Sequence, residues 1–195
     1  MQKRLDVYLS ENNTVKSRSL AASLIKQGSV EVNGRICTKA SFAVDDNDNI
    51  RIIGEMPKYV GRGGLKLEKA LSHYRLHLDG SVCIDIGAST GGFTDCMLQN
   101  GAVKVYSVDV GTDQLDEKLR NDPRVVSMEK TDIRNCVGAL PAVDFIGIDV
   151  SFISLKLVLP SAYALLKDGG ECVALIKPQF EAGKSHLSKH GIVRD

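Results

Sequence analysis

The chain has 195 residues, of which 43% are hydrophobic and 25% charged, which suits one medium domain or a small domain followed by a medium one. Its 25 basic and 24 acidic residues nearly cancel, so the whole chain is not marked as a nucleic-acid binder and any basic surface must be local. No apolar run approaches the roughly 20 residues of a membrane span, and the N-terminus lacks a signal-peptide core. Five scattered cysteines without a C-x-x-C pair argue against disulfides and a metal site, and favour a reduced, cytoplasmic compartment.

Residues 1–56 are predicted to form a small α+β module. A short helix begins near Leu5, and Ser17 or Ser19 can cap a second helix that ends at Gly28. A strand over 30–32, a tight hairpin turn and a last strand over 50–53 follow. Residues 1–40 contain seven basic and three acidic residues. This local excess of positive charge fits either an RNA-binding surface or an ordinary solvated helix face.

A linker is predicted over residues 57–64, because this segment contains a proline and three glycines. An amphipathic helix begins at Leu65, and Lys66 lies away from its apolar face. Judged from this pattern alone, Lys66 is an ordinary surface lysine.

Residues 80–178 alternate between strand-like and helix-like stretches. Strands are expected over 82–86, 104–110, 124–128, 143–150 and 172–176, and helices over 94–99, 114–120 and 155–166. This alternation predicts an α/β fold with a parallel sheet and helices on both faces. Ligands on such sheets bind at the carboxyl ends of the strands, so the residues that end each strand are the candidates for a site.

The first of these strands runs into the glycine-rich loop 87–92, which lets a ligand approach the backbone closely. The loop is neither G-x-G-x-x-G nor a P-loop, which argues against dinucleotide and nucleoside-triphosphate sites. Asp109 ends the next strand, 22 residues after Gly87, where a carboxylate can accept hydrogen bonds from a ribose. Asp132 is placed to take an adenine amino group. S-adenosylmethionine has a ribose and no phosphates, so it is the predicted cofactor, although strand-end aspartates also serve as caps and turn formers.

Two residues at the ends of buried strands are candidates for the chemistry. Lys177 would be costly there unless it were paired, and Asp149 at the end of a neighbouring strand is within reach. A lysine that is desolvated beside a second cation can act as a general base, which suits removal of the proton from a ribose 2′-hydroxyl. The alternative is a purely structural ion pair.

The N-terminal segments resemble a known RNA-binding domain. Arg4-Leu5-Asp6, Ser17-Arg18-Ser19, residues 24–34 and Lys39-Ala40-Ser41 are similar to the domain of the ribosomal-protein-S-four type, and the similarity covers almost all of residues 3–53. It implies that basic side chains contact RNA phosphates. Such contacts position the RNA without reading its bases. The implied RNA-binding residues are Arg4, Lys16, Arg18 and Lys26, with Arg62 of the linker added to them.

The whole chain resembles the TlyA family, also called haemolysin A, through residues 59–67, 85–95, 149–155 and 176–181. Members of this family resemble FtsJ-type ribose 2′-O-methyltransferases fused to an RNA-binding domain, and act on ribosomal RNA. Their catalytic set is Lys-Asp-Lys-Glu, and Lys66, Asp149 and Lys177 match its first three members. The resemblance implies a Rossmann-like, S-adenosylmethionine-dependent domain over residues 65–195. The expected cofactor-binding residues lie in the glycine loop and at strand ends: Asp85, Gly87, Ala88, Ser89, Thr90, Gly91, Gly92, Phe93, Asp109, Asp132 and Asp149.

The chain departs from the family pattern in two places. Gly61 stands where the family usually has serine, which we expect to loosen the linker. The fourth catalytic residue, a glutamate, has no counterpart, and Glu181 is no substitute because it belongs to the Pro-Gln-Phe-Glu motif. FtsJ-type sheets have seven strands, so we expect a domain that is incomplete at its C-terminus and a chain whose activity is in question. Residues 182–190 are expected to form a mobile loop near the substrate.

The predicted function is therefore an S-adenosylmethionine-dependent ribose 2′-O-methyltransferase whose partners are ribosomal RNA or ribosomal subunits. A non-catalytic RNA-binding or ribosome-assembly factor with a vestigial methyltransferase fold is the main rival, and the missing glutamate favours it. A membrane-lytic protein is a minor rival, opposed by the lack of a membrane-length apolar segment.

Overall fold

A computed structural model describes residues 2–12, 14–15, 17–54, 57–182, 187–188 and 192–193. Lys16 and most of the tail 182–190 lie outside the described residues. The chain divides into two units, Met1–Met56 and Pro57–Asp195. Each unit has its own hydrophobic core and is described by itself.

The first unit is built from short strands and two helices around a small core. Its sheet of three antiparallel strands has the order β3-β2-β5, and β1 pairs with β4. The helix α2 begins after Ser17, whose hydroxyl accepts a hydrogen bond from the amide of Leu20 at 3.2 Å, so that the predicted cap is confirmed. The pair β1–β4 was not predicted, because two residues are too few to show a pattern. The elements are β1 (Lys3–Arg4), α1 (Leu5–Glu11), α2 (Arg18–Lys26), β2 (Val30–Val32), β3 (Arg35–Ile36), β4 (Ala43–Val44) and β5 (Ile50–Ile52).

The second unit contains five parallel strands in the order β10-β9-β6-β7-β8, which confirms the predicted parallel sheet. The strands are β6 (Val82–Ile86), β7 (Lys104–Val108), β8 (Val125–Met128), β9 (Val143–Ile148) and β10 (Leu166–Ala174). The helices are α3 (Gly63–Tyr74), α4 (Gly92–Gln99), α5 (Glu117–Arg120), the short η1 (Ile133–Asn135), α6 (Leu155–Leu165) and α7 (Pro178–Glu181).

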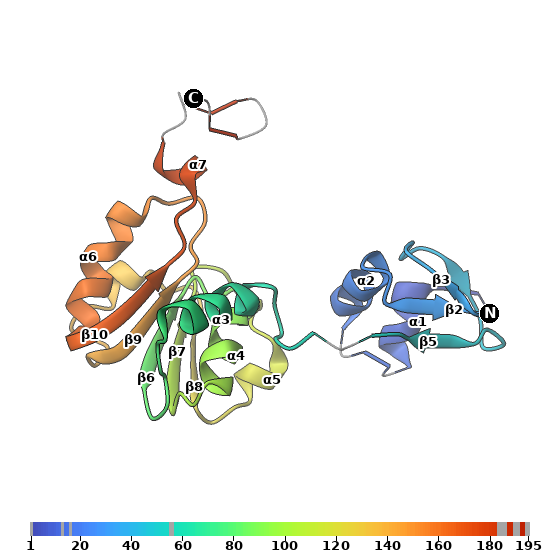
Figure 1. Cartoon of the computed structure of the whole chain (residues 1–195), viewed down its shortest axis with the longest axis horizontal. Helices are drawn as coiled ribbons and strands as arrows, with labels where there is room; N and C mark the ends of the chain where they lie inside the picture. The colour runs from blue at the N-terminus through green and yellow to red at the C-terminus, as the bar shows by residue number, and fades with distance from the viewer. Residues whose placement is uncertain are drawn as a thin grey trace. The chain divides into compact units, whose positions relative to one another are not determined.

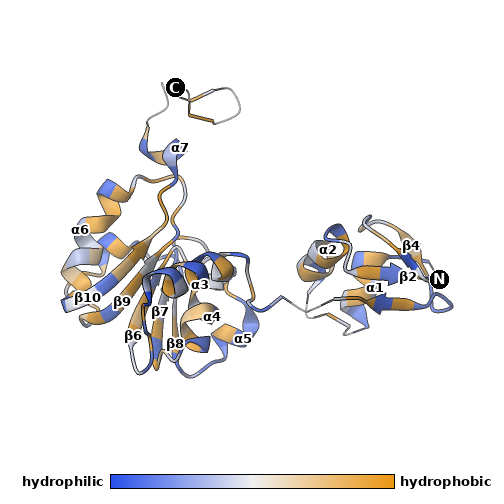
Figure 2. Cartoon of the chain, in the orientation of Figure 1, coloured by the Kyte–Doolittle hydropathy of each residue, from blue (hydrophilic) through white to orange (hydrophobic). Residues whose placement is uncertain are grey.

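Alternate residues of the central strands face two different cores. Cys83 of β6 and Phe145 of β9 belong to the core under α3 and α4, whereas Ile84, Ile146 and Ile148 belong to the core under α6. Helices therefore cover both faces of the sheet, as predicted (Figure 1). These strands are largely orange in the hydropathy colouring because they are buried on both faces (Figure 2). Within the described residues, no helix combines the length and apolar character that crossing a bilayer requires.

Two elements begin more than two residues away from their predicted starts. The strand β10 begins at Leu166 instead of residue 172, and its register against β9 shifts between Leu166 and Glu171. Two glycines and several polar residues in this stretch hide the strand from a hydrophobic pattern. The helix expected over 114–120 is reduced to α5, because the carboxylate of Asp116 accepts a hydrogen bond from the amide of Lys118 at 2.9 Å and caps a later start.

A fully buried carboxylate joins the centre of the sheet to α4. The Oδ2 atom of Asp85 accepts hydrogen bonds from the amide and hydroxyl of Thr94, at 2.9 and 2.7 Å. The Thr94 hydroxyl also lies 2.7 Å from that of Ser107 on β7. Among the described residues, Oδ1 of Asp85 has no hydrogen-bond partner. Burial raises the pKa of Asp85 to about 7, against the opposing effect of the Thr94 hydrogen bonds.

This raised pKa predicts a pH dependence of folding. The folded state holds its proton up to about pH 7, whereas the unfolded carboxyl loses it near pH 3.9. The stabilisation that the protonated Asp85 carboxyl gives the folded state is complete below pH 3.9. It is lost as pH rises towards 7, which lowers the free energy of unfolding by up to about 4 kcal/mol. We expect Asp85→Asn to show a flatter decline of unfolding free energy between about pH 4 and 7 in urea titrations. Asp168→Asn, at an exposed carboxylate, should keep the wild-type slope, and an unchanged slope in Asp85→Asn would contradict the account.

Candidate active site

A cavity of about 230 Å³ opens at the carboxyl ends of β6 and β9, where a doubly wound sheet is expected to bind its ligand. Backbone of the glycine loop forms one side and charged side chains form another. The lining residues are Gly63, Lys66, Gly87, Ala88, Ser89, Thr90, Gly92, Phe93, Asp149, Ser151 and Lys177.

Two lysines from different parts of the chain share the carboxylate of Asp149. Lys66 of α3 places its Nζ 3.2 Å from Oδ2, and Lys177, which follows β10, places its Nζ 2.6 Å from Oδ1. The Lys177 ammonium also donates to the hydroxyl of Ser151 at 2.8 Å. The side chain of Lys177 is 21% exposed and that of Lys66 is 51% exposed. The structure therefore brings together the three residues that match the catalytic set.

The contact between Lys177 and Asp149 is an ion pair without hydrogen-bond alignment. Although the two atoms lie 2.6 Å apart, Oδ1 of Asp149 is buried and accepts no hydrogen bond from any described residue. The ammonium group of Lys177 is therefore the partner that offsets the burial of this oxygen.

Two glycines are required by the close approach of backbone segments at the cavity. At Gly87, which has φ +84°, a Cβ would lie 2.8 Å from the carbonyl oxygen of Asp149. At Gly92, a Cβ would lie 2.9 Å from the amide nitrogen of Gly64. Any side chain at either position would push the glycine loop away from the end of β9 or from the start of α3.

Asp109 supports the glycine loop from the end of β7. Its carboxylate accepts a hydrogen bond from the amide of Ser89 at 2.8 Å and another from the amide of Gly111 at 2.7 Å. Ser89 itself has φ +47°, a conformation that this contact helps to hold. Each carboxylate oxygen keeps a further lone pair, so Asp109 can still accept from a ribose.

Three other predicted cofactor residues lie away from the cavity lining. Asp85 is fully buried beneath the loop. Gly91 faces α5, where a Cβ would collide with the side chain of Leu119. Asp132 caps η1 through the amide of Arg134 at 2.9 Å and forms an ion pair of 2.6 Å with its guanidinium group. All three are engaged in holding the fold around the site.

The basic residues predicted to bind RNA are mostly exposed. Arg4 and Arg18 both pair with Asp6, and Lys26 is exposed in the last turn of α2. Arg62 is exposed immediately before α3. Lys16 lies outside the described residues, so the structure says nothing of its position.

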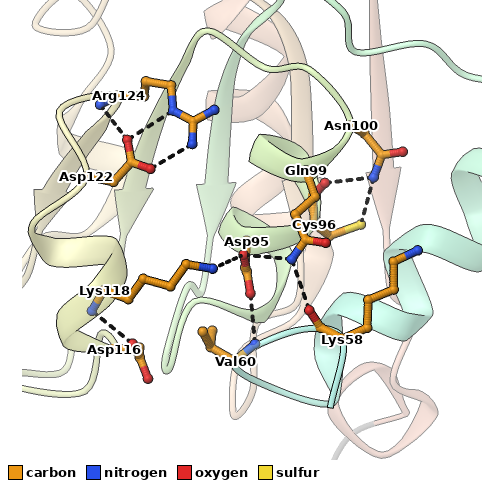
Figure 3. A network of polar contacts seen from close by, with 10 residues as sticks. All are labelled: Lys58, Val60, Asp95, Cys96, Gln99, Asn100, Asp116, Lys118, Asp122 and Arg124. Atoms are coloured by element: carbon orange, nitrogen blue, oxygen red, sulfur yellow. Dashed lines mark hydrogen bonds and ion pairs between the residues drawn. The ribbon is translucent and has the colours of Figure 1, made fainter. Parts of the chain in front are cut away.

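The segment that precedes α3 is held against α4 by Asp95, which sequence reasoning did not single out (Figure 3). The buried Asp95 carboxylate accepts hydrogen bonds from the amide of Val60 at 2.9 Å and from Gln99 at 3.0 Å, and Lys118 lies 3.4 Å from it. Gln99 also donates to the carbonyl of Lys58 at 3.0 Å. Residues 57–64, predicted as a linker, therefore pack within the second unit.

Gly61 belongs to this packed segment. A Cβ at Gly61 would lie only 2.6 Å from the hydroxyl oxygen of Thr90 in the glycine loop. The missing side chain therefore allows close packing against the loop, and the loosening of the segment by glycine stays a prediction.

An aromatic pair, Phe152 and Phe180, lies close in sequence to Asp149 and Lys177, and Phe152 is exposed. Phe152, three residues after Asp149, is 92% exposed and has φ +65°, a strained conformation for a bulky side chain. Its ring centroid lies 5.2 Å from that of Phe180. The carboxylate of Glu181 accepts from the hydroxyl of Ser154 at 2.6 Å and from the amide of Leu155 at 2.9 Å, so that α7 is tied to the start of α6.

We predict that Asp95→Asn loosens the segment before α3. The asparagine side chain keeps one acceptor oxygen, but its NH₂ group faces one of the donor groups of Val60, Gln99 or Lys118. A hydrogen bond worth about 1–3 kcal/mol is therefore lost. Hydrogen exchange of the Val60 amide, measured by mass spectrometry, should be about tenfold faster or more. Asp122→Asn, which removes a carboxylate paired with Arg124, should leave that exchange unchanged. Equal exchange in Asp95→Asn and wild type would refute the anchoring role.

Comparisons with known proteins agree with this geometry. A family model described as FtsJ-like methyltransferase matches residues 59–195, and one described as S4 domain matches residues 3–50. The chain is 48% identical to "Putative rRNA methyltransferase YqxC" of Bacillus subtilis, over 100% of this chain and 70% of that protein. It is 40% identical to "16S/23S rRNA (cytidine-2'-O)-methyltransferase TlyA" of Mycobacterium tuberculosis, over 98% of this chain and 73% of that protein.

A solved structure shares the fold over the whole chain. The protein described as "Putative hemolysin from Streptococcus thermophilus" superposes with a TM-score of 0.73 at 47% identity, covering 100% of this chain and 72% of that one. These findings confirm the fold class and the family predicted from the sequence motifs. The chain belongs to the family of FtsJ-like methyltransferases and carries an S4 domain at its N-terminus.

Proposed function

We propose that this chain methylates the 2′-hydroxyl of a ribose in ribosomal RNA and uses S-adenosylmethionine as the methyl donor. The observation that carries the proposal is the convergence of Lys66 and Lys177 on Asp149 beside a glycine-lined cavity. The names of the relatives, which describe rRNA methyltransferases, support the choice of substrate. Action on ribosomal RNA would also place the protein in the cytoplasm.

The residues around the cavity fit S-adenosylmethionine. The glycine loop 87–92 offers backbone without a phosphate-binding lysine, Asp109 has lone pairs for ribose hydroxyls, and Asp149 adds a carboxylate to the cavity lining. When bound, the cofactor supplies an electrophilic methyl group. The chain's own residues then have to orient and deprotonate a hydroxyl group.

Lys177 is the proposed general base, because it is the less exposed lysine and lies at the end of the sheet beside Asp149. In its neutral amine form it would take the proton of the 2′-hydroxyl as the oxygen attacks the methyl group. Asp149 and Ser151 would then hold the ammonium group that forms. Lysine bases in proteins often lie beside a second cation, and Lys66 supplies one on the same carboxylate.

RNA binding is assigned to the S4 domain. Arg4, Arg18 and Lys26 are its proposed phosphate contacts, and Arg62 in the second unit is a further one. Such contacts place RNA without selecting the nucleotide, so recognition of the target must involve the surface around the cavity.

We predict that Lys177→Ala lowers methyl transfer to ribosomal RNA by about a hundredfold to ten-thousandfold. Transfer can be measured with S-adenosylmethionine carrying a radioactive methyl group. Cofactor binding, measured by calorimetric titration, should survive, because the glycine loop and Asp109 are untouched. The control Lys156→Ala removes an exposed lysine of α6 and should retain transfer. Equal loss of cofactor binding and methyl transfer in Lys177→Ala would contradict the role of Lys177 as the base. A wild-type chain that binds RNA but not the cofactor would favour the alternative of a non-catalytic RNA-binding or ribosome-assembly factor.

We also predict that Phe152 stacks on a base of the RNA substrate. Its exposed ring and strained backbone suit a stacking platform, and a stacked base contributes about 1–3 kcal/mol. Phe152→Ala should lower kcat/KM for RNA by the corresponding factor while cofactor affinity stays the same. Tyr163→Ala removes another exposed ring, on α6, and should behave as wild type. If both variants lose the same activity, Phe152 has no special part in binding RNA.

A further inference from the structure

Asp6 in the first unit is a buried carboxylate that collects two arginines from separate elements. Arg4 of β1 donates through Nε to Oδ1 at 2.9 Å and through Nη2 to Oδ2 at 3.0 Å. Arg18, the first residue of α2, donates through Nε to Oδ2 at 2.9 Å. The amide of Val7 donates to Oδ1 at 3.1 Å, so that Asp6 accepts four hydrogen bonds.

The three side chains differ sharply in exposure. The Asp6 side chain is 4% exposed, whereas those of Arg4 and Arg18 are 49% and 59% exposed. Hydrogen bonds from Arg4, followed by those from Arg18, lower the pKa of Asp6 to about 2 although burial opposes them, so it stays ionised at neutral pH. Within the described part of the chain, Nη1 of Arg4 and both Nη atoms of Arg18 donate no hydrogen bond. Those groups are oriented by Asp6 and remain free to bind an anion.

The start of α2 adds a second attraction for an anion. Acidic residues are favoured in the first turn of a helix because the amide groups there carry partial positive charge. The first turn of α2 contains none, and its first residue is Arg18. Arg18 therefore lies at the positive end of a nine-residue helix.

We infer that Arg4, Asp6 and Arg18 form a preorganised clamp for the phosphate backbone of RNA, in which Asp6 is the positioning residue. The inference rests on the proposed RNA-binding function of the S4 domain and adds an acidic residue to its surface. A guanidinium group whose Nε side is fixed presents its remaining N–H groups in a planar fork that matches phosphate oxygens. Because both guanidinium groups are fixed in advance, the two long side chains lose less conformational entropy when RNA binds.

If Asp6 positions the two arginines, its removal is expected to change the RNA affinity in the direction opposite to that expected from charge alone. Removal of a negative charge beside phosphate contacts strengthens RNA binding if charge alone matters. If orientation matters, Asp6→Asn weakens binding, because the amide can no longer hold two guanidinium groups. Asp46→Asn is the matched control, since it removes one exposed carboxylate from the same unit and is expected to bind RNA as tightly as wild type or more tightly.

The test is filter binding of purified bacterial ribosomal RNA to the full chain at several concentrations of potassium chloride. We expect Asp6→Asn to raise Kd about three- to tenfold and to make the dependence of log K on log salt shallower by about one unit. Circular dichroism, with thermal melting, identifies the temperature range in which the variant is folded. Binding by Asp6→Asn equal to that of Asp46→Asn would overturn the clamp.

A second variant protects the test against a folding defect in Asp6→Asn. The double substitution Arg4→Lys with Arg18→Lys keeps both positive charges at exposed positions and removes both planar forks. It should also bind ribosomal RNA about three- to tenfold more weakly than wild type, and wild-type affinity would overturn the clamp. If wild type itself does not retain ribosomal RNA, the proposed RNA-binding function fails, an outcome distinct from failure of the clamp alone.

Discussion

The carboxylate of Asp149 is the constraint on which the candidate site depends. It lies at the end of a central strand and is the shared partner of two lysines from α3 and from the segment after β10. Without it, two ammonium groups would face each other at a partly buried position, which is costly. This side chain therefore links the start of α3 to the segment that follows β10. Its Oδ1 atom is buried against the ammonium group of Lys177, at 2.6 Å.

Backbone packing makes this arrangement possible. Gly87 lets the loop touch the end of β9, and Gly92 lets the start of α3 reach the start of α4. Asp95 then fixes the segment before α3 by accepting a hydrogen bond from Val60. Lys66 follows this segment directly, so its position depends on contacts made by residues that never touch the cavity. The S4 domain uses the same device, since a buried carboxylate, Asp6, holds two exposed arginines.

Much of the fold was predictable, because buried parallel strands have an apolar pattern and glycine loops and caps have local signatures. The pairing of Asp149 with Lys177 followed from strand ends meeting at one edge of a sheet. Lys66 was not predictable from pattern alone: its partner lies 83 residues away, and only the family resemblance singled it out. Asp95 looked like an ordinary polar residue of α4 for the same reason. The positive φ of Phe152 has no local signal, since any aromatic residue in a loop has the same appearance in the sequence.

The central claim is that this site methylates ribose oxygens of ribosomal RNA. The most direct measurement is mass spectrometry of the nucleosides of unmodified ribosomal RNA, after incubation with the chain and S-adenosylmethionine. We expect a new 2′-O-methylated nucleoside that is absent when either protein or cofactor is omitted. A methyl group on a base, or no new nucleoside although protein, cofactor and RNA bind one another, would contradict it.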